Sequence, residues 1–267
     1  MTRHNYNLPK HVQFSDAIDA NMPNRRHGLA TAVPAGTTFI VSNFPAFAHT
    51  VILDDAGGGT TAATVSNGDQ AAGSFITSIT GNTATDANAI VTATAATRRD
   101  WNPWIRFLWY VGTNTHMASV RNWIGAYSSD PSALDTLATL SAACFGFDTV
   151  EDGTSVASGT AYWKCNTGDT STQKSTTTDV KIVANTVYMG EIRMDTATAR
   201  VDFYLASLGV YTVARARPVP ALSLVASHAT SVPAATTPLL LGGTATVLAT
   251  AAAAKRIIIG ACALSQD

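Results

Sequence analysis

The sequence predicts an all-β protein, a sandwich or jelly roll of antiparallel strands. Apolar runs recur at intervals of about ten residues with turn-rich stretches between them, and no long segment has helical periodicity. Only 13% of the 267 residues are charged, against roughly 25% in an average soluble domain. Ala, Thr, Ser and Gly take their place, a mixture that suits pleated sheets joined by small-residue turns. The clearest single signal is a period of two from Tyr188 to Leu205, interrupted by a turn at 195–198.

Residues 1–35 are predicted to form an extended N-terminal arm. They carry few large apolar side chains, and 15–20 could make one helical turn but nothing longer. Such an arm cannot build a core by itself, so we expect it to lie along a neighbouring subunit or along the body of its own domain. Arg25, Arg26 and His27 form a short basic spot on an otherwise neutral chain. Together with Phe14 they are our candidates for contact with a partner.

Residues 36–97 are predicted to be an N-terminal β segment, either a small β module or the first strands of the sandwich. Short apolar runs alternate here with Gly-rich and Asn-rich turns. The runs predict strands at 37–41, 50–53, 74–80 and 89–94.

Residues 98–267 are predicted to be the main jelly-roll sandwich. Trp104 to Val111 is a nearly continuous apolar run, typical of a strand covered on both faces. Ser132 to Leu140 predicts a short helix, the only one in the chain, and the Thr-rich and Ser-rich stretch from Thr167 to Thr178 predicts an exposed loop. Further strands are expected at 122–127, 142–148, 160–166, 188–194, 201–205, 239–241 and 256–264.

The charge balance and the chain ends exclude several classes of protein. With 17 Lys and Arg against 18 Asp and Glu, the chain lacks the cationic excess of a general nucleic-acid binder, so we expect no nucleic-acid partner. The first ten residues are polar and predict no signal peptide. The most apolar stretch, 251–264, is interrupted by Lys255 and Arg256 and is too short to span a membrane.

No catalytic, metal or cofactor site is predicted. Three scattered cysteines give neither a zinc pattern nor a disulfide framework. A Cys144–Cys165 bridge stays open, because it depends on whether their strands adjoin. The two glutamates, Glu151 and Glu191, lack the spacing that paired-carboxylate glycoside hydrolysis needs, and the six histidines are dispersed.

Tryptophans and arginines gather between residues 98 and 123, and three interpretations of this cluster remain open. The rings could fill the core, form a subunit contact or provide a platform on which sugar rings stack. Trp101 and Trp104 are the candidates for the subunit contact. Trp109, Trp123 and Tyr204 are the candidates for glycan contact.

From Trp104 to the C-terminus the succession of strands resembles the concanavalin A-like lectin and glucanase jelly roll. The resemblance rests on structural positions such as WIGAY at 123–127, CFGFD at 144–148, AYWK at 161–164 and RIIIG at 256–260. It covers about 160 residues, and the first 100 match no family. The sequence is similar in particular to proteins of tailed bacteriophages that carry this sandwich on the virion. The resemblance implies no catalytic motif.

This resemblance implies a non-enzymatic virion structural protein. The expected role is decoration and stabilisation of the capsid through the N-terminal arm, with the major capsid protein or other virion subunits as partners. A homo-oligomer assembled in the host cytoplasm and located in the virion is also expected. The alternative is a carbohydrate-binding adhesin, in the tail or in a head fibre, that recognises host glycans. A polysaccharide-degrading enzyme of the same fold is a third hypothesis.

Overall fold

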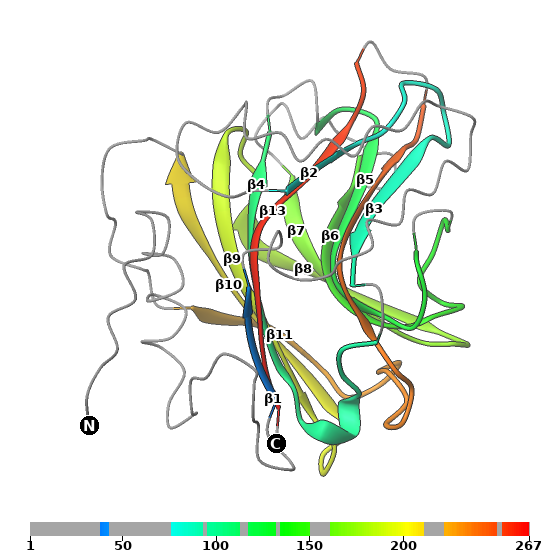
Figure 1. Ribbon diagram of the computed structural model, residues 1–267, viewed down its shortest axis with the longest axis vertical. Helices are drawn as coiled ribbons and strands as arrows, with labels where there is room; N and C mark the ends of the chain where they lie inside the picture. Colours follow the sequence, from blue (N-terminus) through cyan, green and yellow to red (C-terminus); the bar gives the residue numbers. More distant parts are fainter. Residues whose placement is uncertain are drawn as a thin grey trace.

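The computed structural model describes residues 38–42, 76–92, 95–112, 117–131, 134–149, 161–210, 222–249 and 253–266. These residues form two antiparallel sheets that face each other (Figure 1). The sequence-based prediction of an all-β antiparallel sandwich is therefore confirmed. The arm at 1–35, with Phe14, Arg25, Arg26 and His27, lies outside the described residues. No helix in the described part of the chain is long and apolar enough to cross a membrane.

One sheet has seven strands in the order β1-β13-β4-β9-β10-β11, and β2 also pairs with β13. Every pairing in it is antiparallel. Its strands are β1 (Thr38–Ser42), β2 (Ile76–Ile79), β4 (Trp104–Val111), β9 (Thr186–Asp195), β10 (Arg200–Val210), β11 (Ser223–His228) and β13 (Arg256–Gln266).

The other sheet has six strands in the order β3-β12-β5-β6-β7-β8, again all antiparallel. The described strands of 36–97 therefore pair with strands of the sandwich: β1 and β2 with β13, and β3 with β12. The strands of this sheet are β3 (Ala87–Val91), β5 (Val120–Tyr127), β6 (Ser141–Asp148), β7 (Tyr162–Asp169), β8 (Gln173–Lys181) and β12 (Leu240–Val247).

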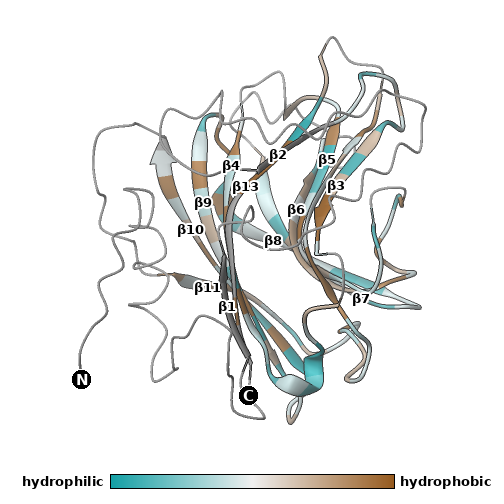
Figure 2. Cartoon of the chain, in the orientation of Figure 1, coloured by the Kyte–Doolittle hydropathy of each residue, from teal (hydrophilic) through white to brown (hydrophobic). Residues whose placement is uncertain are grey.

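The core lies between the two sheets and is rich in aromatic rings. Trp109 stacks on Phe145 with ring centroids 5.5 Å apart, and its ring meets that of Trp163 edge-on at 5.3 Å. Tyr188 and Phe203 complete the group. The strands that supply these rings alternate as expected, and β9 and β10 show successive bands of different hydropathy (Figure 2). Offset and edge-on pairs of this kind add to the stabilisation from burial alone.

The alternate residues, which point away from the core, are also buried in places. On the seven-stranded sheet, Arg106 and Glu191 are 1% and 0% exposed, and the Nε atom of Arg106 donates to Glu191 Oε2 at 2.7 Å. On the six-stranded sheet, a second apolar cluster forms around Trp123 and Tyr127. Leu134, Leu137 and Leu140 cover it from the segment between β5 and β6. Both outward faces of the sandwich therefore carry buried side chains in addition to those of the core.

Two local predictions were wrong. Within the expected helix at 132–140, the described residues 134–140 form turns that lie over Trp123. The expected loop at 167–178 instead contains the end of β7 and most of β8. β8 was missed because its Thr-rich and Ser-rich sequence lacks an apolar face, and its pairing with β7 is what makes it a strand. The sequence analysis also missed β11, which pairs with β10 at the edge of its sheet.

Cys144 and Cys165 are both buried and both free. Their strands do adjoin, but Cys144 pairs in register with Asn166 and Cys165 with Phe145. Neighbouring positions on a strand point to opposite faces, so Cys144 joins the outer cluster and Cys165 the core. The open question of a bridge is thereby answered in the negative. Burial raises the pKa of both thiols, which makes them inert small apolar residues.

His228 connects the edges of the two sheets. The ring is fully buried, with Nδ1 2.8 Å from Thr167 Oγ1 and Nε2 2.9 Å from Thr176 Oγ1. Burial, and next the positive charge of Lys174, lower its pKa from the ordinary 6.5 to about 4. The folded chain therefore keeps the ring neutral at a pH where the unfolded chain protonates it.

This difference predicts a loss of stability in acid. The contribution of His228 is complete above pH 6.5 and is lost as the pH falls toward 4, because the unfolded state then binds one more proton. In urea unfolding at a series of pH values, the wild type should lose stability more steeply than His228→Gln over this window, by up to about 1.4 kcal/mol per pH unit. Parallel curves for the two proteins would contradict the assignment.

Candidate functional site

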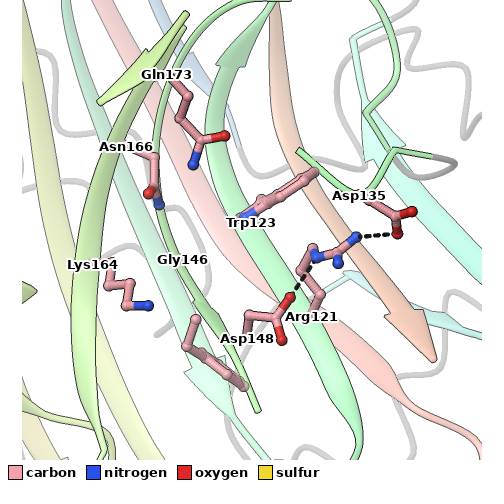
Figure 3. A pocket seen from close by; sticks show the side chains of 9 residues that line it. Arg121, Trp123, Asp135, Gly146, Asp148, Lys164, Asn166 and Gln173 are labelled. Atoms are coloured by element: carbon pink, nitrogen blue, oxygen red, sulfur yellow. Dashed lines mark hydrogen bonds and ion pairs between the residues drawn. The ribbon is translucent and has the colours of Figure 1, made fainter. Parts of the chain in front are cut away.

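A polar recess opens on the outward face of the six-stranded sheet (Figure 3). β5, β6, β7 and β8 supply its floor and one wall, and the turn segment at 134–140 forms the other wall. Because the core takes the alternate residues of these strands, the recess receives those that point the other way. It is lined by Arg121, Trp123, Asp135, Gly146, Phe147, Asp148, Lys164, Asn166 and Gln173.

Arg121 and Asp148 form the buried ion pair of the recess. They are directly opposite each other on β5 and β6, and Arg121 Nε donates to Asp148 Oδ2 at 2.7 Å. Arg121 Nη1 also donates to the carbonyl oxygen of Leu134 and lies 3.4 Å from Asp135 Oδ1. This arginine therefore fixes the covering segment to the sheet while neutralising the carboxylate of Asp148.

Trp123 and Gly146 form the floor. A Cβ atom on Gly146 would lie 2.4 Å from Cδ1 of Trp123 and 2.8 Å from the carbonyl oxygen of Asn122. Only glycine leaves the indole room to lie flat across β6. The guanidinium of Arg121 lies 5.1 Å from the ring centroid of Trp123, a cation–π contact. Figure 3 shows the nitrogen end of the indole turned toward Asn166 and Gln173.

Gln173, Asn166 and Lys164 line the opposite side, from β8 and β7. The side-chain oxygen of Gln173 accepts hydrogen bonds from Thr136 Oγ1 at 2.6 Å and from the Leu137 N–H at 2.8 Å. Its amide nitrogen points into the recess (Figure 3). Gln173 on β8 and Arg121 on β5 thus both bond to the covering segment. Together they fix the position of this wall relative to the sheet.

The recess has matched positive and negative charges, and it offers both hydrogen-bond donors and acceptors. Among its lining residues, the positive charges of Arg121 and Lys164 match the negative charges of Asp135 and Asp148. Amide and ammonium groups donate, carboxylate and amide oxygens accept, and an indole edge adds an apolar surface. A ligand with several hydroxyl groups and no net charge would complement this arrangement. Among the described residues, no group of three His, Cys, Asp or Glu side chains could hold a metal ion.

The glycan candidates named from the sequence do not lie together. Trp109 is 1% exposed in the centre of the core, so the prediction that it contacts a glycan is corrected: its ring has no free face. Trp123 lies in the floor of the recess but is 5% exposed, because the covering segment packs over its ring. Tyr204 is on the outward face of the other sheet, where it flanks Arg193 together with Trp104. Trp101, from the single-turn helix η3 (Arg99–Trp101), is 37% exposed at one end of that sheet.

The polar residues of the recess were not predicted one by one from the sequence. Lys164 and Asn166 alternate with the core residues Trp163 and Cys165. This period of two along β7 could have placed them on one outward face. Arg121 and Asp148 are far apart in sequence, and their pairing depends on the register of β5 against β6, which the sequence does not display.

Comparison with known proteins identifies the fold. No family model matches the sequence, and no curated protein matches it. Among solved structures, basic winged bean lectin with Tn-antigen has a TM-score of 0.51 at 12% identity, covering 86% of this chain and 98% of the lectin. Peanut lectin with a nine-residue peptide has a TM-score of 0.50 at 12% identity, covering 86% and 97%. The fold is the concanavalin A-like jelly roll.

A glucanase domain is a more distant structural match. The catalytic domain of a GH131 β-glucanase from Podospora anserina has a TM-score of 0.43 at 10% identity, covering 72% of this chain and 71% of the enzyme. At that level it says nothing about the chemistry of this chain. The lectin matches confirm the part of the sequence resemblance that concerns the fold, and they do not bear on its bacteriophage part.

Proposed function

We propose that this protein is a non-enzymatic carbohydrate-binding protein whose recess on the six-stranded sheet holds an uncharged saccharide. The observation that carries the proposal is the convergence of Trp123, Lys164, Asn166, Asp148 and Gln173 on one recess with balanced charge. The lectin folds of winged bean and peanut support it, and the first of these lectins was solved with Tn-antigen.

Saccharides need this combination of groups. Each hydroxyl both donates and accepts, so a site with ammonium, amide and carboxylate groups can satisfy several of them at once. The C–H faces of a sugar ring are apolar, and the 5% exposed indole of Trp123 offers them an edge rather than an open ring face. A few rigidly placed polar groups give specificity in such sites, and Arg121 and Gln173 supply that rigidity here by bonding to the covering segment.

The same recess does not suit glycoside hydrolysis. Paired-carboxylate enzymes need an acid and a base or nucleophile on either side of the bond that breaks. The carboxylates among the lining residues are Asp135 and Asp148, and both pair with the single guanidinium of Arg121. The side chain of Asp135 is also 99% exposed, outside any environment that would tune it as an acid. Binding without bond cleavage is therefore the proposed activity.

Removing one donor from the recess should weaken saccharide binding. Lys164→Met keeps the aliphatic stem but loses the ammonium group, and hydrogen bonds to charged groups contribute about 1.5–3 kcal/mol. We expect the Kd for a bound oligosaccharide to rise about ten- to one-hundred-fold in isothermal titration calorimetry. The matched control is Lys181→Met at the exposed end of β8, outside the recess.

The control should bind as the wild type does, and both variants should keep its unfolding midpoint. Equal affinity for all three proteins would place the saccharide elsewhere on the molecule. Weaker binding by Lys181→Met as well would indicate general electrostatic attraction and contradict a defined site.

The expected role in a bacteriophage virion, with capsid partners and self-association, stays a prediction. It rests on the resemblance of the sequence and on the arm at 1–35, which lies outside the described residues. The recess is compatible with the alternative form of that prediction, an adhesin that recognises host glycans. Loss of particle binding on removal of the arm remains its test.

A further inference from the structure

A second polar arrangement lies on the outward face of the seven-stranded sheet, on the other side of the molecule from the recess. The guanidinium of Arg193 lies between two aromatic rings, with its carbon 3.8 Å from the ring centroid of Trp104 and 4.0 Å from that of Tyr204. Trp104 pairs with Arg193 across β4 and β9, while Tyr204 comes from β10. Three adjacent strands therefore build one aromatic clamp.

Glu191 fixes the orientation of this guanidinium. Arg193 Nε donates to Oε1 of Glu191, whose other oxygen accepts from Arg106. Glu191 is 0% exposed, so the Nε side of Arg193 points down to the sheet. Among the described residues, none accepts a hydrogen bond from the terminal nitrogens of Arg193, and the side chain is 29% exposed. With Nε bound to Glu191, the terminal N–H groups of Arg193 are the donors left for a ligand.

Arginines and aspartates alternate at the surface around the clamp. Asp202, directly opposite Arg193 on β10, lies 2.8 Å from Arg200, and Asp100 lies 3.1 Å from Arg98. The carboxylate of Asp195 accepts hydrogen bonds from Thr198 Oγ1 and from the Ala197 N–H. The side chain of Arg200 is 49% exposed, whereas that of Asp202 is 12% exposed. The carboxylates near the clamp are thus engaged in ion pairs or hydrogen bonds of their own, and Arg200 adds a second exposed guanidinium beside Arg193.

We propose that the Arg193 clamp, defined by Trp104, Arg193 and Tyr204, binds a carboxylate side chain of an acidic protein segment. A planar guanidinium presents parallel N–H groups that match a carboxylate in bidentate geometry. Holding it between two rings and a buried acid removes the entropy cost of ordering it on binding. The clamp thus has the features of a preorganised anion contact.

A protein partner suits this surface better than an acidic polysaccharide. Trp, Tyr and Arg are the residues that dominate the energetics of protein interfaces. The face that each ring turns toward Arg193 is filled by the guanidinium, so that face cannot stack on a sugar. The clamp also includes Trp104, which the sequence analysis named as a partner contact. The clamp shares no residue with the saccharide recess, so a test of one proposal does not decide the other.

The test is an NMR titration of the full chain with the peptide acetyl-Gly-Glu-Ser-Glu-Gly-amide, whose glutamine analogue serves as a neutral control. We expect saturable shifts of the Arg193 Nε–H and Trp104 indole signals with the glutamate peptide alone. The Arg193→Lys variant, which keeps the charge but loses the planar fork, should bind at least about ten times more weakly. Arg200→Lys, the matched change on the neighbouring strand β10, should bind within about twofold of the wild type.

The indole signals of Trp109 and Trp163 report whether the core of each variant is intact, because both rings are buried there. Equal weakening by Arg193→Lys and Arg200→Lys would overturn the proposal in favour of diffuse charge attraction. Tighter binding of polygalacturonate than of the peptide would overturn the choice of a protein partner. The absence of any shift at Arg193 would overturn the site itself.

Discussion

Replacing Glu191 with alanine is expected to lower the free energy of unfolding by about 3–5 kcal/mol, the usual cost of leaving one member of a buried ion pair without its partner. Glu191 and Arg106 are 0% and 1% exposed and are joined by a hydrogen bond of 2.7 Å. Removing the carboxylate takes the ion-pair partner Glu191 away from the buried charge of Arg106 and also from Arg193. Urea unfolding followed by circular dichroism measures the difference.

Two further variants isolate the ion pair. Changing both residues, Glu191→Met with Arg106→Met, removes the charge together with its partner and should be less destabilising than Glu191→Ala alone. Asp135→Ala removes an exposed acid that lies 3.4 Å from Arg121 and should change stability by less than about 0.5 kcal/mol. A cost below about 1 kcal/mol for Glu191→Ala would show that the pair is not buried as described.

The second large effect is expected in the aromatic core. Trp109→Ala should cost about 3–5 kcal/mol, since it removes a whole indole and leaves a cavity that the surrounding sheets cannot close. The ring touches Phe145, Trp163 and Tyr188, with centroids 5.3–6.0 Å away. Its tip reaches Gly190, where an added Cβ would lie 2.8 Å from Cη2 of Trp109. Differential scanning calorimetry gives the corresponding fall in Tm.

Trp101→Ala is the matched control for this change. The side chain is 37% exposed and stacks only with Arg98, at 4.5 Å among the contacts described. Its loss should cost less than about 1 kcal/mol. If the two tryptophan variants were equally stable, Trp109 could not be part of the core, and its earlier assignment as a glycan contact would become possible again.

The sequence predicted those strands that have one apolar face. Tyr188, Ile192 and Phe203 are core residues at alternate positions, and their spacing indicated the β9–β10 hairpin and its inner face. β8 could not be found in this way, because its exposed residues are as polar as those of a loop. The segment at 134–140 was misleading for the opposite reason. Leu134, Leu137 and Leu140 have helical spacing but are used to cover Trp123.

Of the residues named singly as glycan contacts, Trp123 is the one that lines the recess. Its remaining groups meet because β5, β6, β7 and β8 pair in one register, which brings Arg121 beside Asp148 and places Lys164 and Asn166 on the same face. A single sequence does not contain this register. The Arg193 clamp has the same origin: Trp104 and Tyr204 were both singled out from the sequence, in different roles, and only strand pairing shows that they hold one guanidinium.

The most direct measurement is a glycan array probed with the full chain, as the wild type and as the double variant Lys164→Met with Asn166→Ala. If the recess is a saccharide site, the wild type will bind a defined set of uncharged glycans, and the folded double variant will lose that set. An array without signal for the wild type would contradict the proposed function. Unchanged binding by the double variant would contradict the location of the site.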